Sequence, residues 1–301
     1  MSTVLITGAG SGMGNATARL LAAAGHTVYA SMRNVNGRNA GRAEALRELA
    51  ARGRLALRVV DLDVQSQESA DAAVKSVVAA EGTLDVVVHN AGHLVIGYAE
   101  AFSAEEIEHL LDVNVLGQQR VNRAALPHMR ERGAGYLVYI GSTTSPVHPP
   151  FMAPYVTSKV AGDALAETTA FEVSQLGIET TIVMPGALTE GTEHFANATQ
   201  AADQATTAAY AVLDPLVTSV GEKTVAMNPE GMDASPEAVG REVVRLLAME
   251  HGTRPHRSLV DFQNLGLEEI NDLKAKLTAR VLEGIGMERL LTVQTMSAQT
   301  G

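Results

Sequence analysis

Short apolar runs, many of them rich in β-branched residues, recur along the chain and alternate with segments of helical periodicity. Runs of this length and composition are typical of buried strands. The predicted strands are Val4–Thr7, Thr27–Ser31, Leu55–Val60, Leu84–His89, Tyr136–Ile140 and Ile178–Met184. The predicted helices are Met13–Ala24, Arg42–Arg52, Ser66–Glu81, Ala104–Arg132 and Tyr155–Leu176. Ser103 and Glu106 have the spacing of a capping box at the start of the fourth helix.

Strands that are apolar along their whole length and alternate with helices indicate a parallel sheet covered on both faces. Right-handed crossovers then produce an α/β, doubly wound sheet of the Rossmann type. No linker, repeat or low-complexity segment divides the chain, so we expect a single domain over residues 1–301. A last short strand is predicted at Ser258–Asp261, and a helical tail at Leu265–Val293.

The segment 187–235 differs from the rest because it is rich in Ala, Thr and Gln. It separates the sixth strand from a helix that begins Ser235-Pro236-Glu237, with a capping serine and a proline in the first turn. A connection of this length predicts a lid over a substrate site, with ordinary packing helices as the alternative. Within it, Thr199–Leu213 has a helical pattern.

Composition and charge narrow the possible functions. Hydrophobic residues make up 46% of the 301 residues and charged residues 19%, as in a soluble globular protein with a sizeable core. The formal net charge of −11 argues against a nucleic-acid partner. The absence of cysteine excludes disulfides and thiolate metal sites, and no metal is expected. No apolar run reaches about 18 residues, and no basic stretch precedes the first strand. We therefore expect no membrane span, no secretory signal and a cytoplasmic location.

Four alternate glycines follow the first strand in the stretch TGAGSGMG, from Thr7 to Gly14. Glycine tolerates positive φ and lets a ligand approach the backbone closely. The helix that follows directs unpaired N–H groups and a partial positive charge at whatever lies before it. The spacing of Gly8, Gly12 and Gly14 therefore predicts a cradle for a pyrophosphate, and a flexible turn is the simpler alternative.

Polar or backbone-special residues follow all six of these strands, although turns by themselves require some of them. After Gly8, these positions are Arg33, Asp63, Asn90-Ala91-Gly92, Ser142 and Pro185-Gly186. In an open parallel sheet the carboxyl ends of the strands share one edge, which is where ligands bind. The sequence therefore predicts one site at this edge.

Tyr155 and Lys159 are spaced four residues apart near the start of a predicted helix, so they share one helix face. A free tyrosine has a pKa near 10, too high for efficient proton transfer at neutral pH. A neighbouring cation and a helix N-terminus both favour the phenolate, so we expect Lys159 to lower the pKa of Tyr155. The alternative for this pair alone is a solvated surface contact.

The chain resembles the short-chain dehydrogenase/reductase family. The matching motifs, in the family's order, are TGxxxGxG (Thr7–Gly14), LDV (Leu62–Val64), NAG (Asn90–Gly92), NVLG (Asn114–Gly117), Ser142, Tyr155-x-x-x-Lys159 and Pro185-Gly186. Each motif is weak, but the ordered set is highly specific. The long segment before residue 235 resembles the steroid and retinol dehydrogenases of the family more than its shortest members.

The resemblance implies a hydride transfer between a nicotinamide cofactor and a ketone or secondary alcohol. It makes Tyr155 the general acid in reduction and Lys159 the residue that assists it and holds the nicotinamide ribose. It makes Ser142 a hydrogen-bond donor to the carbonyl oxygen, and Asn114 the holder of a water that links Lys159 to solvent. The structural alternatives are an ordinary turn serine for Ser142 and a helix kink for Asn114.

The family's cofactor contacts fall on a set of loop residues here. They are Gly8, Ser11, Gly12, Met13, Gly14, Asp63, Val64, Asn90, Ala91, Gly92, Tyr155, Lys159, Pro185, Gly186 and Leu188. The end of the second strand decides between the two nicotinamide cofactors, because NAD enzymes place an acid there for the ribose 2′-hydroxyl. This chain has Arg33 there, with Arg38 and Arg42 following, which favours NADP because arginine suits a 2′-phosphate. Ser11, where many NADP-dependent relatives have a basic residue, points the other way.

Two positions depart from the family pattern. His89 stands where relatives often have asparagine, and Glu190 stands where a threonine often meets the nicotinamide amide, so Thr189 or Thr192 would serve instead. The expected substrate pocket is mostly apolar and suits a hydrophobic ketone or alcohol. Its candidate lining residues are His93, Leu94, Val95, His148, Phe151, Met152 and Leu188.

Two other functions fit parts of the pattern. A regulatory protein that senses a dinucleotide would need the glycines, but not Ser142, Tyr155 and Lys159 together. A methyltransferase would explain the glycines and not the tyrosine–lysine pair. The resemblance also implies a homodimer or homotetramer that pairs through the helices at about 104–132 and 155–176.

Overall fold

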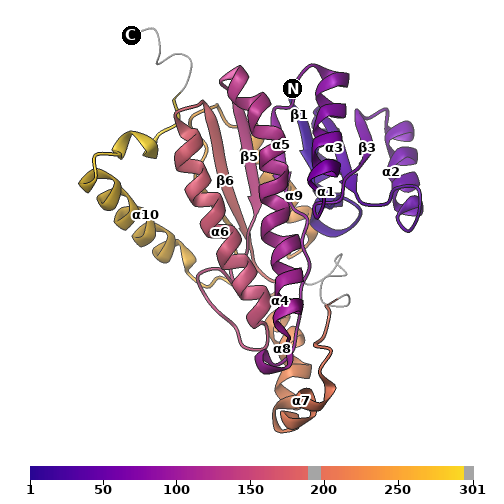
Figure 1. Cartoon of the computed structure of the whole chain (residues 1–301), viewed down its shortest axis with the longest axis vertical. Coiled ribbons are helices and arrows are strands. Elements are labelled where there is room, and N and C mark those ends of the chain that lie inside the picture. The colour runs from indigo at the N-terminus through magenta and orange to yellow at the C-terminus, as the bar shows by residue number, and fades with distance from the viewer. Residues whose placement is uncertain (189–197, 295–301) are drawn as a thin grey trace.

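A seven-stranded parallel sheet forms the centre of the molecule (Figure 1). The computed structural model describes residues 1–188 and 198–294. The strands are β1 (Thr3–Ile6), β2 (Thr27–Met32), β3 (Leu57–Asp61), β4 (Val86–His89), β5 (Gly135–Ile140), β6 (Ile178–Pro185) and β7 (Arg257–Val260). Their order is β3-β2-β1-β4-β5-β6-β7, so the winding reverses between β1 and β4. This confirms the predicted α/β, doubly wound fold in one domain.

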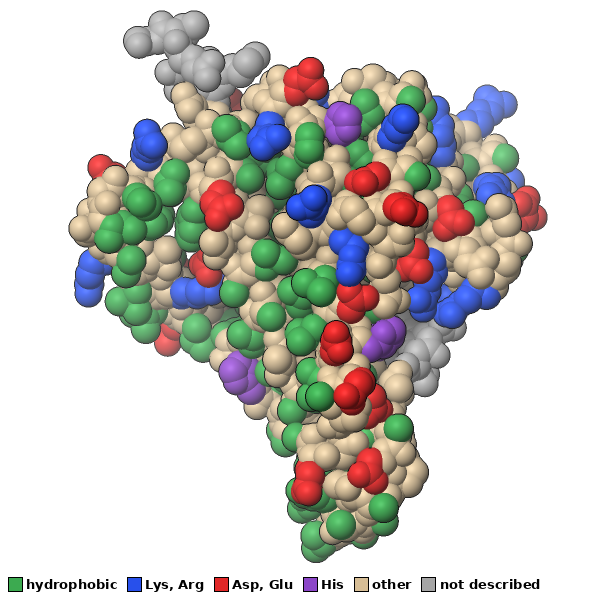
Figure 2. Space-filling model, in the orientation of Figure 1, with side chains coloured by type: hydrophobic (Ala, Val, Ile, Leu, Met, Phe, Trp, Pro, Cys, Tyr) green, Lys and Arg blue, Asp and Glu red, His purple; other side chains and the backbone are tan. Residues whose placement is uncertain are grey.

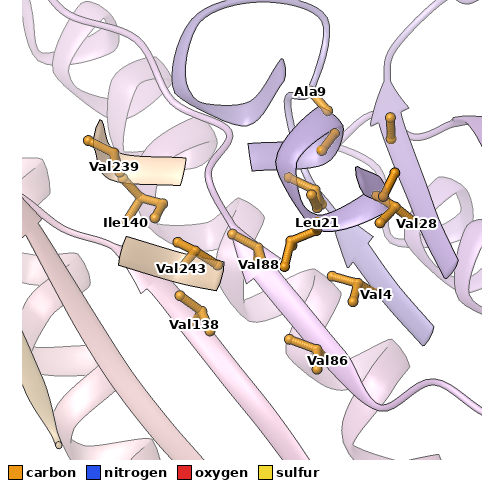
Figure 3. Close-up of a cluster of buried hydrophobic side chains, with 14 of the residues drawn as sticks. Val4, Ala9, Leu21, Val28, Val86, Val88, Val138, Ile140, Val239 and Val243 are labelled. Carbon is orange, nitrogen blue, oxygen red and sulfur yellow. The ribbon is translucent and has the colours of Figure 1, made fainter. Parts of the chain in front are cut away.

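Helices cover both faces of the sheet because strand side chains alternate between the faces. One set, which includes Val4, Val88 and Val138, packs against α1 (Gly12–Ala23), α2 (Ala40–Gly53) and α9 (Pro236–Ala248) (Figure 3). The alternate set, which includes Leu5 and Val87, packs against α3 (Gln67–Glu81), α5 (Gly117–Arg132) and α6 (Ala153–Ser174). The core is therefore two apolar layers with the sheet between them.

The expected helix Ala104–Arg132 is interrupted in the structure. It consists of α4 (Ala104–Leu111), a π-helical turn (Asp112–Leu116) and α5. The capping box at its start is confirmed, because the backbone N–H of Glu106 donates to Ser103 Oγ at 3.2 Å and Glu106 Oε2 accepts from the Ser103 N–H at 2.9 Å. Helical periodicity could not reveal the π turn, because Asn114 within it is held by His93 and Ser158, which are distant in the sequence.

The connection between β6 and α9 contains less continuous helix than expected. The predicted helix Thr199–Leu213 is wrong in its first turn, because Thr199 pairs as a β-bridge with Val95. Helix α7 (Gln204–Ala209) begins later, where Asp203 caps it by accepting from the N–H of Thr206 at 2.9 Å. A 3-10 turn (Ala211–Leu213) and α8 (Asp214–Ala226) follow, and α8 was not predicted.

The C-terminal part adds helix α10 (Leu267–Gly284) and a 3-10 turn (Glu288–Leu291) beyond β7. Another 3-10 turn (Ala99–Ala101) precedes α4. Figure 1 shows α10 at the side of the molecule, beyond β6 and α6. Among the helices in residues 1–188 and 198–294, none is both long enough and apolar enough to cross a membrane.

Candidate active site

The glycine-rich loop after β1 is fastened to the end of β4 by two polar side chains. Thr7 Oγ1 accepts hydrogen bonds from the backbone N–H groups of Asn90 and Ala91, both at 3.0 Å. The amide of Asn90 donates to the carbonyl oxygens of Thr7 and Gly8 at 2.9 and 3.0 Å. Gly14 must be glycine here, because an added Cβ would lie 2.4 Å from Asn90 Nδ2. The loop is therefore a fixed shape rather than a flexible turn.

The loop leaves the start of α1 accessible. Gly8 and Gly12 have φ of 67° and 53°, which favours glycine at both positions. Ser11 is the N-cap, but within the described residues its side chain makes no capping hydrogen bond. By contrast, Ser66 and Ser235 cap α3 and α9 with their side chains. The first-turn N–H groups of α1 are thus not masked by their own cap, as an anion site requires.

A cavity of about 980 Å³ runs along the carboxyl edge of the sheet, from this loop to the start of α6. It collects most of the residues that the sequence singled out. Those lining it are Gly8, Ser11, Gly12, Met13, Arg33, Asp63, Val64, Asn90, Ala91, Gly92, Ser142, Tyr155, Lys159, Pro185, Gly186 and Leu188. Gly14 and Asn114 are not among the lining residues, because they lie behind the surface and support it.

Three arginines line the end of the cavity nearest the second strand: Arg33, Arg38 and Arg42. Arg33 follows β2 directly, and its Nη1 donates to Gln65 Oε1 at 3.4 Å. The loop between β2 and α2 is held by Asn39, whose amide donates to the Arg33 carbonyl at 2.6 Å. This end of the cavity can therefore offer several guanidinium groups to an anion.

Ser142 and Tyr155 meet on the wall of the cavity where β5 ends and α6 begins. Pro154 stands in the first turn of α6 and places Tyr155 one residue later. Burial raises the pKa of Tyr155 to about 12, and a hydrogen bond with the Ser142 side chain opposes this rise. The Ser142 hydroxyl also accepts from the N–H of Thr144 at 3.1 Å. A protonated phenol and a hydroxyl thus face the same space.

Lys159 lies beside Tyr155, one helical turn further along α6. Its Nζ donates to the carbonyl oxygens of Ile140 and Gly141 at 3.0 and 3.1 Å, and lies 5.7 Å from the centroid of the Tyr155 ring. Burial lowers the pKa of Lys159 to about 8. The expected lowering of the Tyr155 pKa by Lys159 is wrong for this structure, because the ammonium is directed at strand carbonyls and burial of the phenol dominates.

Asn114 occupies the middle of the π turn and joins three segments. Its amide donates to the carbonyl oxygen of His93 at 3.0 Å and to Ser158 Oγ at 2.9 Å, and its Oδ1 accepts from the His93 N–H at 3.0 Å. This explains why an asparagine interrupts the helix. The side chain is thus engaged with protein atoms, and its backbone carbonyl faces Gly162 of α6, 3.7 Å from where a Cβ would lie.

Gln263 is a site residue that sequence reasoning missed. Its side chain is buried after β7, donates to the carbonyl oxygen of Ala187 at 3.1 Å and accepts from the Ala187 N–H at 3.0 Å. A Cβ added to Gly186 would lie 2.2 Å from Gln263 Oε1, so the side chain of Gln263 fills the space beside Gly186. It therefore fixes the loop after β6. No local motif marks it, because its contact spans 76 residues.

The expected substrate pocket is only partly as predicted. His93, Leu94, Met152 and Leu188 line the cavity. Val95 and Phe151 pack in a neighbouring apolar cluster with Tyr98 instead, and His148 Nε2 lies 3.1 Å from the carbonyl oxygen of Ser145. Residues of α8 and its C-terminal end complete the wall, namely Val220, Thr224 and Met227. Thr189 and Thr192, considered for the nicotinamide amide, lie outside the described residues.

The departure at His89 is a feature of the core. The ring is buried and stacks on Tyr139 with a centroid separation of 4.4 Å. Burial lowers the pKa of His89 to about 3, so the ring is neutral at pH 7. His89 therefore acts as a packing residue beneath the site rather than as a polar group within it.

Comparison with known proteins finds one matching family model and several relatives. A family model described as short chain dehydrogenase matches residues 2–203. The 3-ketodihydrosphingosine reductase of Bacteroides thetaiotaomicron is 31% identical over 188 residues, which are 62% of this chain and 64% of the relative. Human 17-beta-hydroxysteroid dehydrogenase type 1 is 36% identical over 189 residues, 62% of this chain and 56% of the relative. The match thus spans less than two thirds of both relatives.

A solved structure with the same fold carries a nicotinamide derivative. The alcohol dehydrogenase from the archaeon Thermococcus sibiricus, complexed with 5-hydroxy-NADP, is 26% identical. It superimposes with a TM-score of 0.68 over 86% of this chain and 96% of its own. The likeness therefore extends beyond the sheet to most of the chain.

Proposed function

This chain belongs to the short chain dehydrogenase family. On that premise we propose that it transfers a hydride between NADP and a hydrophobic substrate, reducing ketones with NADPH or dehydrogenating the matching secondary alcohols with NADP⁺. Family membership makes it an NAD(P)-dependent oxidoreductase. The observation that carries the finer proposal is one shared cavity. Ser142, Tyr155 and Lys159 line one part of it and the glycine-rich loop lines another.

The residues at the start of α6 suit the proton half of such a reaction. A bound reduced nicotinamide would supply the hydride to the carbonyl carbon. Tyr155 would donate the proton to the carbonyl oxygen, and its pKa of about 12 means that it holds this proton at neutral pH. Ser142 would donate a hydrogen bond to the same oxygen as negative charge develops there.

Lys159 would return a proton to the Tyr155 site and hold the ribose hydroxyls of the cofactor. Its pKa of about 8 suits a group that exchanges protons near neutral pH. The route to solvent would pass a water held by the backbone carbonyl of Asn114, since the side chain of Asn114 is engaged with His93 and Ser158. Asn114 would thus act in part by positioning the helices.

The residues present fit a dinucleotide. Gly8, Gly12 and the uncapped start of α1 would hold the pyrophosphate, and Asp63 and Val64 would meet the adenine. Arg33 and its two neighbouring arginines would hold a 2′-phosphate, which favours NADP over NAD. The bound 5-hydroxy-NADP of the Thermococcus sibiricus enzyme supports the same choice.

A titration of NADPH and NADH, followed by nicotinamide fluorescence, tests the cofactor preference. We expect NADPH to bind more tightly. Arg33→Ala should reduce this preference by about 10- to 100-fold, the value of one charge-assisted contact to a phosphate. Tighter binding of NADH by the wild type would refute the role of Arg33 and leave the fold and the family untouched.

The substrate proposal rests on the walls beyond the nicotinamide end. The cavity lining there is mostly apolar and includes Leu94, Met152, Leu188, Val220 of α8 and Met227 directly after α8. We propose that residues 187–235 act as a lid over a hydrophobic substrate. The name of the Bacteroides relative, a ketone reductase, supports a ketone of this character.

Tyr155→Phe distinguishes this function from a regulatory dinucleotide sensor. In a screen of hydrophobic ketones with NADPH, the variant should lose about 100-fold or more of the wild-type turnover while NADPH affinity is retained. Tyr29→Phe is a matched control, because Tyr29 lies on β2 and its hydroxyl donates to Glu81 at 2.8 Å, away from the cavity. Full turnover in Tyr155→Phe would overturn the mechanism, and absence of turnover from the wild type would favour the sensor.

The family resemblance further supports a homodimer or homotetramer that pairs through the helices at 104–132 and 155–176. These correspond to α4, α5 and α6, with Leu116 and Val160 exposed on them. Leu116→Asp should lower the mass in light scattering if this pairing occurs, and an unchanged mass would exclude Leu116 from the interface.

A further inference from the structure

Helix α10 packs against the molecule with a mixed face that contains both polar and apolar residues. The less exposed positions along it are Leu267, Asn271, Lys274, Thr278 and Leu282, which recur every three or four residues and so form one face. Its firmest contacts to the body are ionic. Lys274 Nζ donates to Asp163 Oδ1 of α6 at 3.1 Å and lies 2.6 Å from Glu167 Oε2. Leu267 is buried at the start of α10, and further along the helix the ion pairs of Lys274 hold it to the body.

The apolar side chains of α10 face solvent. Ile270, Leu273, Leu277 and Val281 are 42%, 58%, 47% and 61% exposed, and their spacing places them on a single stripe. Figure 2 shows hydrophobic side chains gathered over this part of the molecule, at the left of the view. A helix normally turns such a stripe towards the core. A continuous exposed stripe marks an interaction surface.

Charges are unevenly distributed along the helix. Glu268, Glu269 and Asp272 lie in its first turns, whereas the later half carries Lys276 and Arg280 with one acidic residue, Glu283. An antiparallel second copy of α10 would set each acidic half against a basic half. Parallel pairing would oppose like charges instead.

The stripe and the charges agree on one register. About a two-fold axis near residue 275, Ile270 would face Val281 of the second copy, and Leu273 would face Leu277. The same register sets Glu269 near Arg280 of the second copy, and by symmetry this pair occurs twice. At about 1.5 Å rise per residue the helix offers a contact about 27 Å long.

We propose that α10 is a dimerisation helix, which pairs with α10 of a second copy of this chain in an antiparallel, two-fold symmetric arrangement. This interface is separate from the α4–α6 pairing that the family resemblance implies, and it does not depend on the reaction. With only four apolar anchors on each side, the dimer forms reversibly, in the micromolar range.

A lipid surface is the competing occupant, because amphipathic helices also bind membranes. Such helices have basic residues beside the apolar stripe, whereas α10 has four acidic and three basic residues, among them Glu283. The chain also has a net charge of −11, which opposes approach to an anionic surface. Paired acidic and basic halves suit another copy of the helix instead.

Sedimentation of the full chain over a concentration series tests the proposal. Leu273→Asp/Leu277→Asp should halve the mass of the largest species, or weaken dimerisation at least about 10-fold. Met232→Asp is the matched control, because Met232 is similarly exposed, at 40%, and lies between α8 and α9, on neither candidate interface. An α10 variant that keeps the wild-type mass and affinity would overturn the proposal, as would a monomeric wild type at all concentrations.

Charge exchange separates pairing from misfolding. Glu269→Arg or Arg280→Glu alone should weaken the dimer, and the double exchange should restore it, which general damage to the fold would not do. Lys276 lies near the two-fold axis and therefore faces Lys276 of the second copy. Lys276→Ala should strengthen the dimer, because it removes the repulsion between these like charges. Failure of the double exchange to restore dimerisation would refute the register. The stripe would be assigned to lipid instead if the wild type does not self-associate but floats with phosphatidylcholine or phosphatidylserine vesicles, and Leu273→Asp/Leu277→Asp does not float.

Discussion

Replacing Gly14 by alanine tests whether the glycine-rich loop is a rigid cradle. An added Cβ would lie 2.4 Å from Asn90 Nδ2 and 2.6 Å from the Gly8 carbonyl oxygen, too close for either atom to remain in place. The loop has little room to retreat, because a Cβ on Gly8 would itself be 2.8 Å from Ala91 Cα. The Asn90 amide must therefore move.

The cost follows from what Asn90 holds. Its amide donates to the carbonyl oxygens of Thr7 and Gly8, and each hydrogen bond contributes about 1 kcal/mol. Crowding adds about 1 to 2 kcal/mol, and alanine recovers about 1 kcal/mol over glycine within a helix. The free energy of unfolding should fall by about 2 to 3 kcal/mol. For a chain of 301 residues the melting temperature should then fall by roughly 3 to 5 °C.

Thermal unfolding with and without NADPH measures both consequences. Gly41→Ala is the control, because Gly41 lies in α2 and its added Cβ meets no atom within 4 Å. It should leave the protein as stable as the wild type or more stable by up to about 1 kcal/mol. NADPH should bind Gly14→Ala at least about 10-fold more weakly. A variant that melts at or above the wild-type temperature would refute the packing argument. Lower stability with unchanged NADPH affinity would show that the loop is not the cradle.

Three further substitutions test the site and its support. Burial lowers the pKa of Lys159 to about 8 from 10.5, so the unfolded chain binds that proton more tightly. As the pH rises from 8 towards 10.5, the free energy of unfolding of the wild type, measured in urea, should increase by up to about 3 kcal/mol relative to that of Lys159→Met. A difference between the two proteins that stays constant with pH would contradict this. Gln263→Leu removes the hydrogen bonds that hold the loop after β6 and should raise the Kd for NADPH about 10-fold. An unchanged Kd would show that Gln263 does not support cofactor binding. Asp163→Asn removes the carboxylate that accepts from Arg257 at 2.6 and 2.7 Å and leaves Arg257 with Glu167 at 3.4 Å, so it should cost about 2 kcal/mol at pH 7. The pKa of Asp163 is lowered in the folded protein, so the stability difference between the wild type and Asp163→Asn should vanish in acid. The control is Glu44→Gln, which breaks the exposed pair of Glu44 with Arg47 and should change stability by less than about 0.5 kcal/mol.

Local patterns were sufficient for most of the fold. All seven predicted strands form, and Ser103 and Ser235 cap helices as their neighbours indicate. An apolar run indicates a buried strand, and two suitable residues three positions apart indicate a helix cap, so both signals are local in the sequence. The π turn around Asn114 and the β-bridge at Thr199 escaped prediction because each is stabilised by a segment distant in the sequence.

The candidate site divides in the same way. Most of the residues in the ordered motifs, from the glycines to Tyr155 and Lys159, line the cavity. They could not reveal Gln263, whose contact to Ala187 depends on β6 and β7 being neighbours. The pKa of Tyr155 was misjudged for a related reason. Sequence spacing supplies the neighbouring cation, but only packing decides how deeply the phenol is buried and where the ammonium points.

The sequence by itself determined the fold class, the edge of the sheet that carries the site and the residue types present there. It could do so because strand order, turn chemistry and helix spacing depend on residues close together in the chain. Only the tertiary structure decided which of those side chains face the cavity and which ones, like Asn114, support it from behind. It also decided that α10 docks through the buried Leu267 and the ion pairs of Lys274, and turns its apolar stripe outward. Burial and contact depend on segments that folding brings together, and no local pattern records them.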